Sequence, residues 1–163
     1  MGAGILPIAK HNHNIYIMLG RERPVEGFED SKKWSDFGGG ALPNETDEEC
    51  AAREGAEETM EMFGTKETLR KSIEECIFRI PTENYVSYVV EVDYDETLPK
   101  KYEKIFKCIK KNNSQLIKDN NGYFEKDKMG WYLLKKFKDG KKDKYLRPFF
   151  REIIKQLCTE LCD

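Results

Sequence analysis

Apolar residues in this chain of 163 residues occur mainly in short runs separated by polar turns. Runs of this length, rich in β-branched and aromatic residues, are typical of strands. They predict strands at residues 5–9, 15–19, 34–37, 72–80, 85–92 and 131–134. The first two are separated only by the turn 11–14, which predicts a hairpin or two neighbouring strands. In 85–92 the side chains alternate between a valine-rich face, which we expect to be buried, and a face that could line a pocket.

Three other segments have the periodicity of helices. Residues 49–61 are rich in Ala and Glu, with Thr46 and Glu49 in the positions of a capping box and Gly64 placed to end the helix. Apolar side chains recur at helical spacing in residues 98–111 and 147–161. In residues 98–111 lysines occupy the other positions. The element order predicts a mixed α/β fold, and the length suits one domain over residues 1–163.

The helix predicted at 49–61 carries an unusual set of acidic residues. Spacings of three, four and seven place Glu54, Glu57, Glu58 and Glu61 on one helical face. Like charges on one face repel each other, and a cation between them would relieve this repulsion. A glutamate-rich face is more often simply solvated, so this spacing alone does not identify a site.

The surrounding residues resemble the Nudix box, GX5EX7REUXEEXGU, in which U is a bulky apolar residue. Six positions match in register: Gly39, Glu45, Arg53, Glu54, Glu57 and Glu58. The chain departs from the pattern at Gly55 and Glu61, where apolar residues are expected, and at Met60, which replaces the last glycine. A close approach of the helix to its neighbours would explain Gly55. A helix that continues to Phe63 and ends at Gly64 would accommodate Met60.

The resemblance implies an α/β/α sandwich with a mixed sheet, and hydrolysis of a phosphoanhydride bond with Mg²⁺ or Mn²⁺. In that family the catalytic and metal-binding positions correspond here to Glu54, Glu57 and Glu58, with the backbone of Gly39 near the metal. Such ions prefer carboxylate and phosphate oxygens. Arg53 would point away from the carboxylate face and orient Glu45 or a loop carbonyl.

Substrate-binding residues are less well defined by the sequence. The resemblance places the segment after the second strand beside the substrate, so Arg21 or Arg23 could bind a phosphate, although a surface ion pair explains either arginine equally well. Trp34 and Phe37 could stack on a base, while a place in the core is the simpler expectation. An acidic residue before the strand 131–134 could be a metal ligand or base, and the candidates are Glu125 and Asp127, or both are surface charges.

Charge is distributed unevenly along the chain. Residues 1–99 contain 10 Lys and Arg against 21 Asp and Glu, whereas residues 100–151 contain 17 against 6. The basic segment could hold a polyanion such as capped RNA or an inositol pyrophosphate, and lysines that only keep the protein soluble are an equally good explanation. Lysines scattered over the surface would weaken the polyanion hypothesis.

Three functions therefore remain open. The first is a Nudix pyrophosphohydrolase acting on a nucleoside diphosphate derivative, the second is mRNA decapping or diphosphoinositol polyphosphate hydrolysis, and the third is a non-catalytic module that binds nucleotide or RNA. Five cysteines in no metal-finger spacing predict reduced thiols, with Cys158 and Cys162 as packing residues. Without a long apolar run or signal-peptide pattern, we expect a cytoplasmic protein with no membrane partner. The oligomeric state is not indicated.

Overall fold

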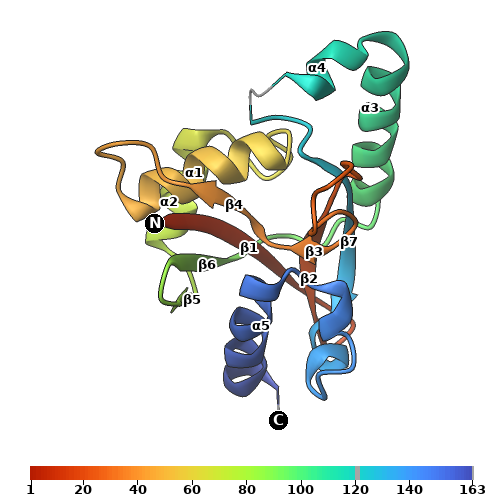
Figure 1. Cartoon of the computed structure of the whole chain (residues 1–163). Coiled ribbons are helices and arrows are strands. Elements are labelled where there is room, and N and C mark those ends of the chain that lie inside the picture. The colour runs from red at the N-terminus through yellow and green to blue at the C-terminus, as the bar shows by residue number, and fades with distance from the viewer. Residues whose placement is uncertain (120–121, 163) are drawn as a thin grey trace.

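The computed structural model describes residues 1–119 and 122–162. Its elements follow in the order β1 (Gly2–His11), β2 (Asn14–Glu22), β3 (Trp34–Ser35), β4 (Phe37–Gly40), α1 (Asp47–Glu58), α2 (Lys66–Glu74), β5 (Phe78–Pro81), β6 (Tyr85–Glu91), α3 (Leu98–Asn112), α4 (Ser114–Lys118), β7 (Lys126–Leu133), the 3-10 helices η1 (Leu134–Phe137) and η2 (Asp143–Tyr145), and α5 (Pro148–Leu161). Figure 1 shows these elements along the chain.

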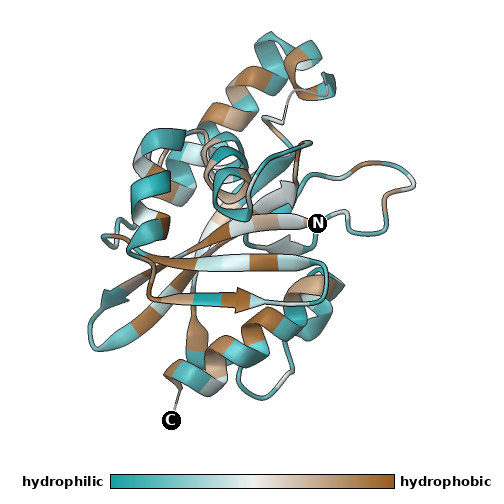
Figure 2. Ribbon diagram, turned by 90° about the vertical axis from the view of Figure 1, so that its left-hand side faces the viewer, coloured by the Kyte–Doolittle hydropathy of each residue, from teal (hydrophilic) through white to brown (hydrophobic). Residues whose placement is uncertain are grey.

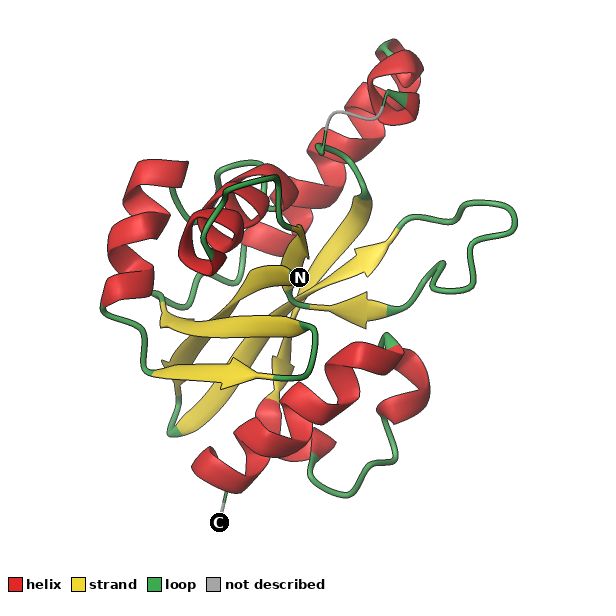
Figure 3. Ribbon diagram, turned by 60° about the vertical axis from the view of Figure 1, so that its left-hand side comes forward, coloured by secondary structure: helices red, strands yellow, loops and turns green. Residues whose placement is uncertain are grey.

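The described strands form one mixed sheet, and β1 is its central strand. β1 pairs antiparallel with β2 and with β4, and parallel with β6. β2 in turn pairs with β3 and β7, and β5 pairs with β6. In Figure 3 the helices α1 and α2 cover one face of this sheet and α5 covers the other. The predicted α/β/α sandwich with a mixed sheet is therefore confirmed.

Each face of the sheet has its own hydrophobic core. Ile5, Met18 and Phe37 belong to the core under α1 and α2, whereas Leu6 and Leu19 belong to the core under α5. Alternate residues of a strand point to opposite faces, so neighbouring positions serve different cores. Figure 2 shows the hydrophobic parts of the strands lying between the helical layers.

Gly55 allows α1 to pack closely on the central strand. A Cβ at this position would lie 2.9 Å from Cγ1 and Cδ1 of Ile5, which is fully buried. Any larger side chain would push the helix away from β1. The departure from the Nudix box at Gly55 therefore reflects close packing of helix on sheet, as expected.

The end of α1 differs from the prediction. The helix stops at Glu58 and does not continue to Phe63. The amide of Glu61 donates to the carbonyl of Ala56 at 2.8 Å, and that of Met60 donates to Glu57 at 3.2 Å. These two bonds form a Schellman motif, in which Met60 adopts the left-handed conformation, with φ of 52°. Met60 thus takes the backbone conformation that glycine usually supplies, and Glu61 lies past the helix and outside the carboxylate face.

A second difference concerns residues 72–80, which we predicted as a strand. Most of this segment belongs to α2 or to the turn after it, and only β5 is extended. Thr65 caps the helix, and its two buried residues, Leu69 and Ile73, are four apart, which is helical spacing. The segment between α3 and β7 contains the short helix α4, and Asn120 and Asn121, which with Gly122 are typical of a turn in the sequence, lie outside the described residues.

Other predictions are confirmed with altered boundaries. The first two strands form a hairpin, whose turn residues Asn12 and His13 both have positive φ. The segment 34–37 divides between β3 and β4, and the late strand β7 starts five residues earlier than predicted. The five cysteines are free thiols, and Cys158 lies on the buried side of α5. None of the described helices is long and apolar enough to cross a bilayer.

The helices α3 and α4 form an excursion from the sheet between β6 and β7. Figures 1 and 3 show this pair standing out from the rest of the molecule. Tyr102 and Phe106 bury one side of α3, and its opposite side is lysine-rich and exposed. The chain then returns towards the end of α1 before it enters β7.

Candidate active site

The start of α1 is fixed by reciprocal capping. The hydroxyl of Thr46 accepts a hydrogen bond from the amide of Glu49 at 3.1 Å, and the Glu49 carboxylate accepts one from the amide of Thr46 at 3.2 Å. Both ends of the predicted capping box are therefore present. This fixes where the helix begins, and hence which residues of its second half face the sheet.

Glu54 lies directly against the glycine strand. A Cβ at Gly39 would come within 2.7 Å of the Glu54 carboxylate, so only glycine leaves room for that side chain. The carbonyl of Gly39 faces α1 and accepts a hydrogen bond from the thiol of Cys50 at 3.4 Å. Gly39 and Glu54 therefore lie side by side, as their spacing in the Nudix-like pattern predicts.

Arg53 joins several parts of this site. Its guanidinium donates to both carboxylate oxygens of Glu45, at 2.8 and 2.9 Å, and to the carbonyl of Gly40 at 3.1 Å. These are the two partners expected from the sequence. Arg53 does not point away from the carboxylate face, however, because its Nη1 also lies 2.9 Å from Glu54 and 3.6 Å from Glu57. The Arg53 hydrogen bond lowers the pKa of Glu45 to about 2.

Glu57 and Glu58 lie beneath the segment that precedes β7. Gly122 packs on the Glu57 carboxylate, and the hydroxyl of Tyr102 donates to the carbonyl of Glu58 at 2.8 Å. The Glu58 side chain is 1% exposed, and its Oε1 has no hydrogen-bond partner among the described residues. Burial raises the pKa of Glu58 well above its usual value. Burial, followed by the charges of Glu54 and Glu22, also raises the pKa of Glu125.

Behind these carboxylates lies a buried cation, Lys126. It is 1% exposed, and its Nζ lies 3.2 Å from the Ser35 hydroxyl and 3.4 Å from Glu22. Glu22 also binds Arg147 at 2.7 Å, so one buried carboxylate is shared by two cations. The charge of Lys126 opposes the rise of the Glu58 pKa caused by burial.

The donor set fits a hydrated divalent cation. Within the described part of the chain, no three carboxylate, thiol or imidazole side chains converge into a preformed metal cage. Mg²⁺ does not require one, because it keeps several waters and binds through one or two carboxylates plus substrate phosphates. The partnerless Oε1 of Glu58, beside Glu54, Glu57 and the Gly39 backbone, is the kind of oxygen that such an ion would take up.

A pocket of about 340 Å³ opens beside Gly39. It is lined by Glu22, Arg23, Val25, Phe28, Gly38, Gly39, Glu125 and Arg147. Nε of Arg23 is buried and has no partner among the described residues. Arg21 is instead held by Asp127, with Nε to Oδ1 at 2.8 Å. Of the two arginines considered from the sequence, Arg23 lines the pocket and Arg21 is engaged in an ion pair.

The two aromatic candidates lie elsewhere. Phe37 is fully buried in the core under α1, so its ring is not accessible to a base. Trp34 is half-buried on the α5 side of the sheet, where it packs edge-on against Tyr132 at 5.2 Å. Neither ring belongs to the pocket beside Gly39.

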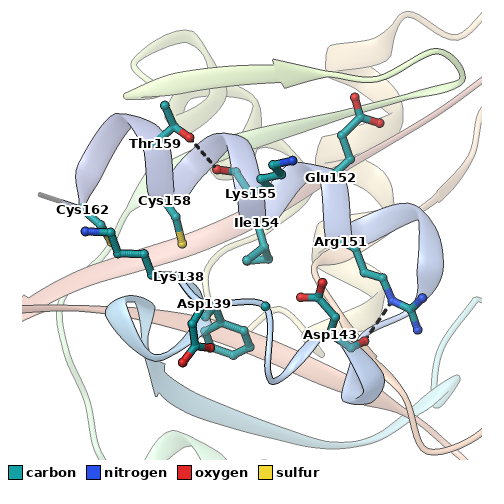
Figure 4. A pocket seen from close by; sticks show the side chains of 12 residues that line it. Lys138, Asp139, Asp143, Arg151, Glu152, Ile154, Lys155, Cys158, Thr159 and Cys162 are labelled. Atoms are coloured by element: carbon teal, nitrogen blue, oxygen red, sulfur yellow. Dashed lines mark hydrogen bonds between the residues drawn. The ribbon is translucent and has the colours of Figure 1, made fainter.

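Several residues of the pocket region were not identified from the sequence, among them Phe28, Arg147 and Lys126. Phe28 and Arg147 line the pocket, and Lys126 lies behind it. The only signal for Phe28 was an apolar ring within a polar loop, and Arg147 and Lys126 were indistinguishable from other basic residues. A larger cavity, of about 670 Å³, lies between α5 and the chain after η1. Its lining, shown in Figure 4, contains none of the predicted site residues.

The NUDIX domain family model matches residues 1–152. This chain belongs to the Nudix family. It is accordingly a hydrolase of the pyrophosphohydrolase class. A search of curated proteins by sequence finds no match.

Several solved structures share the Nudix fold of this chain at low sequence identity. An Ap4A hydrolase from C. elegans, in a binary complex, aligns with a TM-score of 0.57 and 15% identity, covering 99% of this chain and 98% of that one. The NUDIX domain of Shewanella oneidensis NrtR, complexed with ADP ribose, aligns with a TM-score of 0.55 and 11% identity, covering 98% of this chain and 86% of that one. The Nudix hydrolase RenU from M. smegmatis aligns with a TM-score of 0.51 and 13% identity, covering 98% of this chain and 84% of that one.

We predict that Arg53→Gln lowers the free energy of unfolding by about 2 kcal/mol at neutral pH, because the charged hydrogen bonds to Glu45 are lost. The folded pKa of Glu45, about 2, lies below its ordinary value of 4.5. The stabilisation is therefore complete above pH 4.5 and declines as the pH falls towards 2. Urea unfolding at neutral pH and near pH 3 measures this difference.

The matched control is Arg79→Gln. Arg79 pairs with Asp47 at 3.7 Å on the surface, where its side chain is 48% exposed. Exposed pairs contribute little, so this variant should change stability by less than about 0.5 kcal/mol. A loss for Arg53→Gln that is equally large at both pH values would contradict the assigned role of the pair with Glu45.

Proposed function

We propose that this Nudix protein hydrolyses a phosphoanhydride bond in a nucleoside diphosphate derivative, with Mg²⁺ or Mn²⁺ as cofactor. The observation that carries the proposal is the buried, partnerless Oε1 of Glu58 next to Glu54 and Glu57. A buried carboxylate oxygen without a partner is costly to the fold. A divalent cation would stabilise it, and the adjoining pocket offers space for a diphosphate.

Glu54, Glu57 and Glu58, with the carbonyl of Gly39, would hold the metal. The bound cation would supply charge neutralisation at the phosphate oxygens and a water of lowered pKa. The protein's part is to keep these oxygens in place. Arg53 does this by binding Glu45 and Glu54 at once, and Glu45 remains ionised because its pKa is about 2. Glu125, at the mouth of the pocket, is available as a further metal ligand or proton acceptor.

The pocket beside Gly39 would bind the rest of the substrate. Arg23 brings an unengaged guanidinium, which suits a phosphate oxygen. Phe28 is 41% exposed at the pocket, and Arg147 stacks on its ring at 5.9 Å, so a base could lie against the same ring. One structural neighbour is an Ap4A hydrolase, and another is complexed with ADP ribose. In both compounds a nucleoside is joined to a further group through phosphoanhydride bonds. This similarity supports the substrate class without selecting one compound.

We predict that Glu57→Gln and Glu58→Gln each lower kcat by roughly a hundredfold, because each removes a charged metal ligand. Both variants should also bind Mn²⁺ more weakly in a calorimetric titration. Glu58→Gln should leave the metal-free fold as stable as before or more stable, because it removes a buried charge. Mass spectrometry of products from a panel of dinucleotides, nucleotide sugars, nucleoside triphosphates, inositol pyrophosphates and capped RNA measures the turnover.

Glu61→Gln is the matched control. Glu61 follows α1 in sequence but lies past the Schellman turn, so its replacement should leave turnover and Mn²⁺ affinity unchanged. Full turnover in both Glu57→Gln and Glu58→Gln would refute the metal assignment. Nucleotide binding by the unmodified protein, without product at any metal concentration, would instead favour a non-catalytic module.

A second pair of variants separates the two arginines. We predict that Arg23→Ala raises KM for the best substrate about tenfold or more, because a charged hydrogen bond to phosphate is lost. Arg21→Ala removes the same charge from the neighbouring part of β2, but Arg21 is engaged with Asp127. The KM of the Arg21→Ala variant should stay within about twofold of the KM of the unmodified protein. Equal effects of the two variants on KM would contradict a specific role for Arg23.

A polyanionic substrate remains the second candidate, and one observation favours it. Four exposed lysines of α3 lie one turn apart on the side opposite to Tyr102: Lys100, Lys104, Lys107 and Lys111. Only Lys107 among them has an ion-pair partner within the described residues. The lysines that follow β7 lie at the other end of the molecule, near α5 in Figure 1. The basic segment therefore forms two surfaces and no single groove, which weakens the proposal for capped RNA and for an inositol pyrophosphate.

We predict that, if capped RNA is the substrate, Lys104→Gln combined with Lys111→Gln lowers the salt dependence of RNA binding. Each lysine that contacts a phosphate contributes about one unit to the slope of log K against log salt, so the slope should fall by about two. Lys135→Gln combined with Lys136→Gln is the control on the other surface and should leave the slope unchanged. Binding that does not depend on salt would exclude this substrate.

A further inference from the structure

A second apolar pocket, of about 280 Å³, lies on the α5 side of the sheet. Leu19, Phe137 and Leu146 form its floor and are at most 7% exposed. Trp34, Tyr132 and Tyr145 form its walls. It shares no lining residue with the pocket beside Gly39.

The second pocket and the helix α1 lie on opposite faces of the sheet. Trp34 and Leu19 pack in the core under α5, whereas Phe37 and Met18 pack in the core under α1, the helix that carries the carboxylates. A molecule bound against Trp34 therefore lies on the opposite face of the sheet from Glu58. The second pocket is a site in its own right and would not hold the substrate's reacting bond.

The walls of this pocket present aromatic rings that the fold leaves available. Tyr145 is 53% exposed, and its ring contacts among the described residues are with Lys142 at 6.0 Å and Lys144 at 5.2 Å. Trp34 and Tyr132 meet edge to face, which leaves ring surface uncovered. Base rings stack well on such surfaces, and nearby lysines suit a phosphate.

Two polar groups of the pocket walls face solvent. The chain has two tryptophans, and Nε1 of Trp131 donates to the carbonyl of Asp95 at 2.8 Å. By contrast, Nε1 of Trp34 and the hydroxyl of Tyr132 are not among the buried polar atoms without a partner and are open to solvent, and the Tyr132 hydroxyl lies close to the charge of Arg21. Indole and phenol groups at half-buried positions usually find a partner. A heterocycle with donors and acceptors on its edge would supply one.

We propose that this pocket binds the base of a mononucleotide, with the phosphate beside Lys142 and Lys144. Its volume is just below the usual range for ligand sites, which suits the base of one nucleotide and not a dinucleotide. The site is independent of the proposed hydrolysis, because it uses neither the carboxylates of α1 nor a metal.

The test uses the intrinsic fluorescence of Trp34. In a Trp131→Phe variant, Trp34 is the only tryptophan, and circular dichroism confirms that the variant is folded. Titration with AMP and GMP in the presence of EDTA should change Trp34 emission in a saturable way, whereas ribose 5-phosphate, which has no base, should not. Adding Tyr145→Ala should weaken binding about tenfold, because a stacking surface is lost. Adding Lys142→Ala should weaken AMP binding but leave adenosine binding unchanged.

Phe28→Ala in the same background is the matched control, since Phe28 is another exposed ring but belongs to the pocket beside Gly39. It should leave the Trp34 titration unchanged. A signal that is lost with Phe28→Ala and kept with Tyr145→Ala would place the nucleotide in the other pocket and overturn the proposal. The absence of any emission change at millimolar nucleotide would overturn it as well. Because metal is excluded, neither result depends on whether the protein hydrolyses its substrate.

Discussion

Negative charge buried at the end of α1 is the constraint to which the surrounding structure is fitted. Glu58 is almost inaccessible to water, and burial raises its pKa because ionisation there is unfavourable. A fold selected only for stability would place an apolar side chain at such a position. The carboxylate is tolerated because cations lie close to it, and because a further cation would find unused oxygen ligands there.

Two of those cations, Lys126 and Arg147, come from distant parts of the chain, and together with Arg53 they connect its layers. Arg53 ties the helix to Glu45 and to the glycine strand, while Lys126 approaches from β7. Glu22 binds both Lys126 and Arg147, so the start of α5 is coupled to the same group of charges. Loss of any one partner would leave another charge buried and unpaired. The charges at the site therefore also position β7, α5 and the loop that carries Phe28.

The box helix and its partners could be predicted because local sequence determines them. Capping by Thr46, the helical spacing of Glu54, Glu57 and Glu58, and the partners of Arg53 all depend on residues close in the chain. The Schellman turn at Met60 was missed, because a non-glycine residue at positive φ has no sequence signal. Contacts across the sheet were missed for another reason. Nothing local indicates that Lys126 would be buried beside Glu22.

The central place of β1 has a consequence for how the chain acquires its fold. This strand is synthesised before its parallel neighbour β6, which comes more than seventy residues later. Pairings between segments so far apart in sequence form slowly, because the entropy cost of closing a long loop precedes the favourable free energy of the strand contacts. During synthesis the outer edge of β1 would stay unpaired until β6 leaves the ribosome, and the outer edge of β2 until β7 follows. That interval is when the nascent chain is most exposed to aggregation through its unpaired edges.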